Sequence, residues 1–241
     1  MKINVSIEAR MTSSRLPGKV MLPLGNTFVL DMMVQRIKKS KYVNDIIIAT
    51  TVNKEDDAIV DFCKSNNISY FRGSEDNVFE RVLQTHEEYE TDIIVELTGD
   101  CPFLDYTIVD KVIEVYLNNS YDYVSNWIEH TYPIGMSVQV YKYEALKEIS
   151  KKELQYVDKE HVTPEFYTSG KYNIFNVEAP SSLYYPELSI TLDTKEDYEI
   201  MSAIANHFNT IDFTLDDIIK YVKSNPELLD INVLIERKGL S

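Results

Sequence analysis

The sequence predicts an α/β protein with a Rossmann-like, doubly wound and mostly parallel sheet. Apolar runs of strand length alternate with segments of helical periodicity through the first half of the 241 residues. Hydrophobic residues make up 44% of the chain and charged residues 26%, which is the composition of a folded globular protein. No internal repeat or linker composition divides the chain, so we expect a single domain over residues 1–241.

The predicted elements follow one another along the chain. Apolar runs indicate strands at 3–7, 46–49, 68–71, 93–97, 122–126, 136–141, 172–177 and 188–192, the last one returning to the sheet. Helical periodicity indicates helices near 28–40, 55–65, 77–89, 106–118, 196–208 and 214–224. The pattern is looser in residues 126–180, which we expect to lean over the sheet as an inserted arm or lid.

Charge and cysteine usage exclude several classes of function. The chain has 24 Lys and Arg residues against 39 Asp and Glu residues, and its net charge of −15 argues against nonspecific binding to nucleic acid or anionic membranes. No apolar run reaches signal-peptide or membrane-spanning length, which predicts a cytoplasmic protein. Cys63 and Cys101 lack paired spacing, so neither a zinc site nor a disulfide framework is indicated.

A basic loop after the first strand is the strongest functional signal. In parallel sheets, sites lie at the carboxyl ends of the strands, and residues 9–19 follow such an end. The loop contains Arg10, Arg15 and Lys19, with hydroxyls at 12–14 and no acid before Asp31. Cations, hydroxyls and turn amides together suit a triphosphate, although the loop is not a Walker motif. The alternative is a solvated basic loop.

Two aspartates are candidates for a magnesium site. Asp100 follows a strand end and a glycine, and Asp193 follows the predicted strand at 188–192, so the two carboxylates could meet at one Mg²⁺. The alternative for Asp193 is a helix cap, because a helix begins nearby. Arg72 is a further cation, placed to reach a phosphate or a base.

The chain resembles the cytidylyltransferases that make CMP-activated sugars. The segment from Arg10 to Lys19, ending in Arg-Leu-Pro-Gly-Lys, is similar to the signature of that family. Further blocks resemble its spore coat polysaccharide branch in the same order: 71–76, 97–102, 123–126, 160–164 and 192–198. CMP-Kdo and CMP-sialic acid synthetases are more distant relatives.

The resemblance implies a Mg²⁺-dependent transfer of CMP from CTP to a sugar or phosphorylated acceptor, with release of pyrophosphate, in surface glycan or capsule biosynthesis. It implies catalytic roles for Arg15, Lys19 and Asp100, and metal binding by Asp100 and Asp193. The implied nucleotide-binding residues are Ala9, Arg10, Ser13, Arg15, Lys19, Arg72, Ser74, Thr98, Gly99 and Asp100. The implied acceptor-binding residues are Asn126, Tyr132, Ser137, Gln139 and His161. Family relatives dimerise through an equivalent arm, so we expect a homodimer through residues 126–180, which are rich in aromatics.

Departures from the family pattern leave the acceptor open. The acids of the family's Gly-x-Asp-x-Glu stretch are replaced here by Ser137 and Gln139, and Glu8 stands where glutamine is usual. The two neutral residues remove repulsion against an anionic acceptor, which favours a phosphate-bearing one. A guanylyltransferase or another NTP-using transferase of this fold remains an alternative. A glycosyltransferase is disfavoured because the sequence has no Asp-x-Asp, and a noncatalytic nucleotide-binding module is disfavoured because both carboxylates are present.

Overall fold

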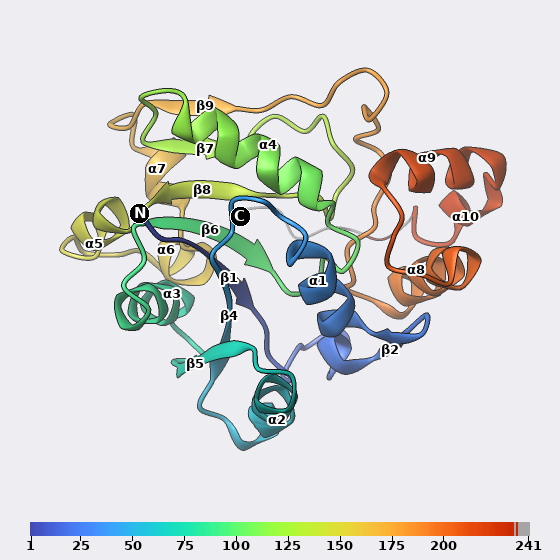
Figure 1. Ribbon diagram of the computed structural model, residues 1–241, viewed down its shortest axis with the longest axis horizontal. Helices are drawn as coiled ribbons and strands as arrows, with labels where there is room; N and C mark the ends of the chain where they lie inside the picture. Colours follow the sequence, from blue (N-terminus) through green and yellow to red (C-terminus); the bar gives the residue numbers. More distant parts are fainter. Residues whose placement is uncertain (234, 236–241) are drawn as a thin grey trace.

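A seven-stranded sheet forms the centre of the computed structural model, which describes residues 1–233 and 235 (Figure 1). In spatial order the strands are β5 (Ser69–Gly73), β4 (Asp45–Thr51), β1 (Ile3–Glu8), β6 (Ile93–Thr98), β8 (Gln139–Lys142), β7 (Tyr123–Ser125) and β9 (Ile174–Asn176). The first four run parallel, and β8 alone is antiparallel to its neighbours. The α/β, Rossmann-like and mostly parallel sheet is therefore confirmed.

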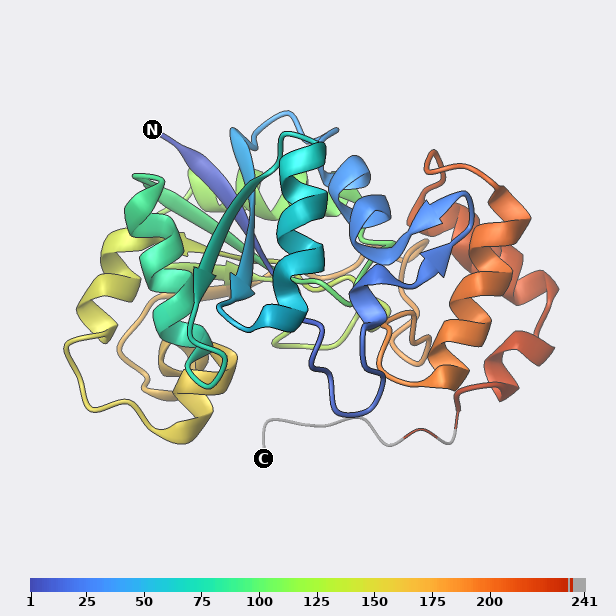
Figure 2. The ribbon, with the colours of Figure 1, turned by 90° about the horizontal axis from the view of Figure 1, so that it is seen from below.

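Helices cover both faces of this sheet (Figure 2). The larger hydrophobic core lies under α1 (Val29–Ile37), α2 (Asp57–Ser65) and α4 (Tyr106–Leu117). The opposite face is covered by α3 (Val78–Glu88), α5 (Tyr143–Ile149) and α7 (Pro164–Thr168), with α6 (Tyr156–His161) beside α3. The sheet is thus enclosed on both sides, which explains why its strands are nearly continuous apolar runs.

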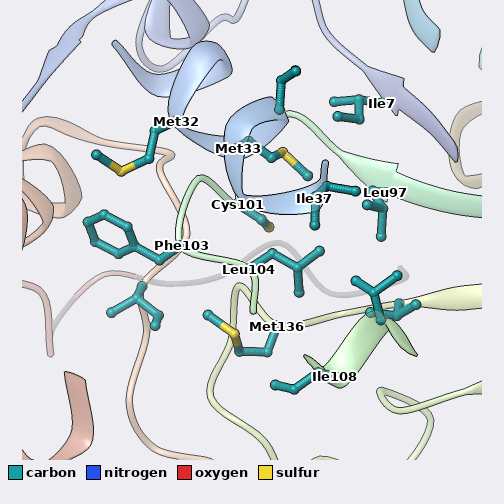
Figure 3. Packing of buried hydrophobic residues seen from close by; sticks show 14 of the residues in the cluster. Ile7, Met32, Met33, Ile37, Leu97, Cys101, Phe103, Leu104, Ile108 and Met136 are labelled. Carbon is teal, nitrogen blue, oxygen red and sulfur yellow. The ribbon is translucent and has the colours of Figure 1, made fainter. Parts of the chain in front are cut away.

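The larger core joins α1 to the segment that follows β6. Met32, Met33 and Ile37 are fully or almost fully buried and lie near Leu97 and Phe103 (Figure 3). Truncating a buried side chain of this size to alanine typically costs about 2–5 kcal/mol. This packing holds the chain after β6 in place, and that segment begins with the Thr98-Gly99-Asp100 stretch of the site.

The carboxy-terminal helices pack at one end of the sheet beside a small hairpin. The elements are α8 (Lys195–Phe208), α9 (Leu215–Ser224), α10 (Glu227–Asp230) and the hairpin of β2 (Pro23–Leu24) and β3 (Thr27–Phe28). Two short 3₁₀ turns lie elsewhere: η1 (Lys19–Met21) contacts α1, and η2 (Lys54–Asp56) leads into α2. The hairpin was not predicted, because its strands have only two residues each. Gly25 sits at its turn with φ +61°, a conformation that favours glycine.

The expected strand at 188–192 is absent from the described residues. This segment is extended and its apolar side chains Leu188, Ile190 and Leu192 are fully buried, but it makes only an isolated bridge between Ser189 and Ile134. The alternation of apolar residues correctly indicated burial on one side. The segment forms no regular strand, because the residues around Ile134 that lie beside it do not form a strand with which it could pair, and the alternation of apolar residues cannot predict such a partner.

Residues 126–180 are partly built into the sheet. This segment supplies β8 and β9, and its short helices α5 to α7 lie against α3 and the sheet. Tyr141 and Phe166 stack with Tyr123 in a second core cluster. Many aromatic side chains of this segment therefore pack inside the protein. The side chains of this segment thus complete the core over β7 and β8. Among the described residues, no helix combines the length and apolarity needed to cross a bilayer.

Candidate active site

A cavity of about 400 Å³ opens at the carboxyl ends of β1 and β6. This is the edge where sites are expected in a parallel sheet. The structure brings most of the predicted site residues to its wall: Ala9, Arg10, Ser13, Arg15, Lys19, Thr98, Gly99, Asp100, Gln139, His161 and Asp193. Residues that lie almost 200 positions apart in the sequence therefore share one space.

Backbone hydrogen bonds fix the shape of the basic loop. The Met11 amide donates to the carboxylate of buried Asp56 at 2.7 Å, and the Gly18 amide donates to the Met11 carbonyl at 2.8 Å. Gly18 has φ +71°, a left-handed conformation that closes the loop before the 3₁₀ turn at Lys19. Arg10, at the start of the loop, forms an ion pair with Glu75 at 3.3 Å. The loop is therefore preorganised.

A close backbone approach sets the position of Asp100. The Gly99 amide donates to the Glu8 carbonyl at 2.9 Å, and a Cβ at residue 99 would lie 2.8 Å from that oxygen. Only glycine allows this contact without a shift of the backbone. The Leu192 amide in turn donates to the Asp100 carbonyl at 2.8 Å, which draws the following Asp193 to the same place. Together these contacts place Asp100 and Asp193 on one wall.

Lys19 lies between the two aspartates. Its ammonium donates to Asp100 Oδ2 at 2.8 Å and to Asp193 Oδ1 at 2.9 Å, and Arg15 Nη2 lies 2.9 Å from the same Asp193 oxygen. Burial by itself would raise the pKa of Asp100. The charge of Lys19 and the hydrogen bonds to the carboxylate lower this pKa by more, so that the result lies below the ordinary value. Burial lowers the pKa of Lys19, and the two carboxylates raise it overall. Both aspartates are therefore held beside a fixed cation.

The donor set fits a magnesium ion that is shared with a ligand. The carboxylates of Asp100 and Asp193 already hold one positive charge, the Lys19 ammonium, between them, which shows that a cation is stabilised at this position. Residues 1–233 and 235 contain no cluster of three or more His, Cys, Asp or Glu side chains that could hold a metal by itself. Mg²⁺ is commonly bound through one or two carboxylates plus phosphate oxygens and water. Asp100 and Asp193 match that pattern.

The cavity wall also carries two acids, buried Glu96 and partly buried Glu8, that the sequence analysis did not identify as functional. Glu96 is 3% exposed, and burial raises the pKa of its carboxyl to about 8 although Tyr141 and Gln139 donate hydrogen bonds to it. Burial, followed by the charge of Glu96, raises the pKa of Glu8 well above its ordinary value. Arg81 and Trp127 also line this part of the cavity. A lone acid inside the apolar run Ile93–Leu97 was the available signal for Glu96.

Two predicted nucleotide-binding residues do not reach the cavity. Arg72 donates to the carbonyls of Thr51 and Asn53 at 2.8 and 2.7 Å, and it pairs with Asp57 at 2.7 Å. Its guanidinium therefore joins β5 to the loop after β4. The Ser74 hydroxyl accepts from the Asn77 amide at 3.1 Å, next to the start of α3. Both side chains have structural partners in place of a ligand.

Three predicted acceptor-binding residues also lie outside the main cavity. The buried amide of Asn126 donates to the Met136 carbonyl at 2.8 Å and accepts from the Val138 amide at 2.7 Å. Tyr132 is 6% exposed and packs in the larger core. Ser137 lines a separate small space of about 10 Å³ together with Asn126 and Tyr132. Asn126 therefore supports the segment that leads into β8, and β8 presents Gln139 to the cavity.

Comparison with known proteins places these features in context. The sequence pattern of a family described as Cytidylyltransferase matches residues 5–226. An uncharacterized protein of Methanocaldococcus jannaschii, MJ1063, is 37% identical over 240 residues, which cover 99% of this chain and 98% of that protein. The spore coat polysaccharide biosynthesis protein SpsF of Bacillus subtilis is 33% identical over 228 residues, covering 92% and 94% of the two chains. The solved structure of a cytidylyltransferase from Leptospira borgpetersenii has a TM-score of 0.90 at 33% identity, covering 98% of this chain and 100% of that one.

Proposed function

The chain belongs to the cytidylyltransferase family and is a nucleotidyltransferase, and on this premise we propose that it transfers CMP from CTP to a sugar acceptor in a Mg²⁺-dependent reaction. The observation that carries the proposal is the meeting of Arg15 and Lys19 with Asp100 and Asp193 in one cavity. Cations suit the triphosphate, and the carboxylates suit the ion that accompanies it.

The transfer is a substitution at the α-phosphorus. An acceptor oxygen forms a bond to that phosphorus, the bond to the bridging oxygen of the β-phosphate breaks, and pyrophosphate leaves with the electron pair. Arg15 and Lys19 would hold the β- and γ-phosphates and stabilise the charge that develops on the leaving group. Asp100 and Asp193 would hold Mg²⁺, which neutralises phosphate charge when bound. The proton of the acceptor hydroxyl leaves to solvent.

The charges of the cavity favour a sugar over a phosphorylated acceptor. Glu8, Glu96 and Glu160 line the cavity together with Arg81 and His161. These three carboxyl groups offer no positive charge to a second phosphate, and Ser137, which suggested an anionic acceptor, does not line this space. The relative SpsF is named for spore coat polysaccharide biosynthesis. We therefore extend the proposal to a step of surface glycan biosynthesis. We further propose that this step takes place in the cytoplasm and that the enzyme is a homodimer.

Acceptor-dependent release of pyrophosphate tests this function. The purified protein would be incubated with Mg²⁺, a panel of sugar acids, amino sugars and phosphorylated sugars, and CTP, GTP, UTP or ATP in turn. We expect release with CTP and a sugar, and loss of release when Mg²⁺ is chelated. A preference for GTP would establish the guanylyltransferase alternative. Transfer from a sugar nucleotide without pyrophosphate release would establish a glycosyltransferase.

A further inference from the structure

The register of the sheet brings two glutamates together in the wall of the cavity. Ser6 of β1 pairs with Glu96 of β6, so Ser6, Glu8 and Glu96 lie on the same face. The Ser6 hydroxyl donates to Glu8 Oε1 at 3.1 Å. Both glutamates line the cavity, and we call this part of its wall, formed by Glu8 and Glu96, the acidic end.

The acidic end is built from ordered hydrogen bonds. Gln139 Oε1 accepts from the hydroxyls of Tyr123 and Thr163, both at 2.6 Å, which fixes the orientation of the amide. Gln139 Nε2 must then donate, and it does so to Glu96 at 3.3 Å, while the Tyr141 hydroxyl donates to the other Glu96 oxygen. Glu96 is thus held in one position by neutral donors.

Neither carboxyl group forms an ion pair of its own, and the charge of Arg81, which acts on Glu8, is the one positive charge shared by the two acids within the part of the chain that the structure describes. Among the ion pairs formed within residues 1–233 and 235, none includes Glu8 or Glu96, whereas Asp100 and Asp193 are both paired. A buried pair of like charges is stabilised either by retaining a proton or by acquiring a cation. A ligand with a positive charge would supply the missing partner.

Arg81 provides an independent indication of a ligand at this end. It is 2% exposed and lines the cavity, and its Nη1 donates to the Ser74 carbonyl. Its Nε is buried and has no hydrogen-bond partner in the described part of the chain. A buried unpaired donor costs about 1–3 kcal/mol, so an acceptor atom from a ligand would be favourable there. The ligand must therefore offer hydrogen-bond acceptors as well as donors.

We propose that the acidic end binds the free amino group of an amino-sugar acceptor, with the ammonium replacing the proton that Glu8 and Glu96 retain without a ligand, this proton leaving to solvent, and a neighbouring hydroxyl oxygen on Arg81. This rests on the proposed nucleotidyl transfer and names its substrate class. An ammonium gives both a charge and three donors, whereas a hydroxyl gives one donor and no charge. An N-acetylated amine loses the charge, and a phosphate or carboxylate adds repulsion.

Matched sugars test the proposal without any need for turnover. Glucosamine, N-acetylglucosamine and glucose share one ring and differ at a single carbon. Each would be titrated into the intact protein at pH 7, with and without CTP, and binding followed by calorimetry and saturation-transfer NMR. We expect glucosamine to bind roughly tenfold more tightly than either of the other two, the size expected for a hydrogen bond to a charged group. Comparable binding of the three sugars, or no measurable binding of glucosamine, would overturn the proposal.

Isosteric variants link the preference to the two side chains. Glu8→Gln and Glu96→Gln should each reduce the preference for glucosamine to about twofold or less, while Glu88→Gln, on the exposed side of α3, should keep it. Retention of the full preference in both variants would overturn the assignment, and thermal unfolding of each variant verifies that it is folded. CTP affinity measured in the same samples separates failure of the proposed function from failure of the amine proposal. If CTP does not bind, the proposed function is contradicted, and the preference for glucosamine is then judged from the titrations without CTP.

Discussion

The ammonium of Lys19 lies 2.9 Å from Asp193, although 174 residues separate them in the sequence. The same ammonium lies 2.8 Å from Asp100, so it occupies the position between the two proposed metal ligands. Lys19 therefore acts as an internal cation in the nucleotide-free protein. In the proposed reaction, entry of Mg²⁺ with CTP would require this side chain to leave the carboxylates and turn to the phosphates.

Removing the Lys19 charge should expose the carboxylates to metal. In Lys19→Met, we expect nucleotide-free protein to bind Mn²⁺ roughly tenfold more tightly than the wild type, because the competing charge is gone. Electron paramagnetic resonance of free Mn²⁺ measures this directly. The same variant should bind CTP more weakly. Unchanged Mn²⁺ affinity would show that Lys19 does not compete for the site.

Neutralising either aspartate should remove activity without unfolding the protein. Asp100→Asn and Asp193→Asn keep the side-chain volume but lose a charged metal ligand, and we expect activity to fall roughly a hundredfold or more at limiting Mg²⁺. Asp216→Asn on the surface of α9 is the matched control. Turnover equal to that of the control, in either site variant, would contradict the metal assignment.

Variants of Arg15 test whether the basic loop binds the phosphates of CTP. Its Nη2 pairs with Asp193 and its side chain is about one-third exposed, so it is free to turn to a triphosphate. We expect Arg15→Ala to weaken CTP binding roughly tenfold, and Arg15→Lys to lie in between because it keeps the charge and loses the planar fork. Calorimetric titration with CTP provides the measurement. Equal affinities for all three proteins would mean that the loop does not bind the phosphates.

Local patterns predicted the parts of the site that follow strands. The basic loop and Asp100 were found from sequence because a strand end, a glycine and a charge cluster are local signals. The acid pair was not found, because a single Glu96 in an apolar run looks like an ordinary strand, and its pairing with Glu8 depends on the register of β1 with β6. The hydrogen bonds of Arg72 could not be predicted for a similar reason, since its partners Thr51 and Asn53 come from another strand end.

The edge strand β9 is the part of residues 126–180 where we expect the homodimer interface. It ends the sheet beside β7, and Phe175 on it remains 39% exposed, whereas Tyr141 and Phe166 of the same segment are buried. An edge strand with an exposed apolar side chain is a common pairing surface. We expect a dimer mass in light scattering at micromolar concentration and a monomer for Phe175→Glu. A monomer mass for the wild-type protein would refute the dimer.

The buried carboxyl of Glu96 should make stability depend on pH in the direction opposite to a salt-bridged acid. Its pKa in the folded protein is about 8 because it is buried, against about 4.3 in an unfolded chain. Between these values the folded state holds a proton that the unfolded state releases, so the contribution to stability is complete below about pH 4.3 and is lost as the pH rises through 8. Glu8, whose pKa is also raised by burial, acts with the same sign. The free energy of unfolding of the wild type, measured in urea from pH 5 to 9, should therefore fall by a few kcal/mol more than that of Glu96→Gln, which cannot titrate. Parallel pH profiles of the two proteins would show that Glu96 is ionised in the folded state throughout this range.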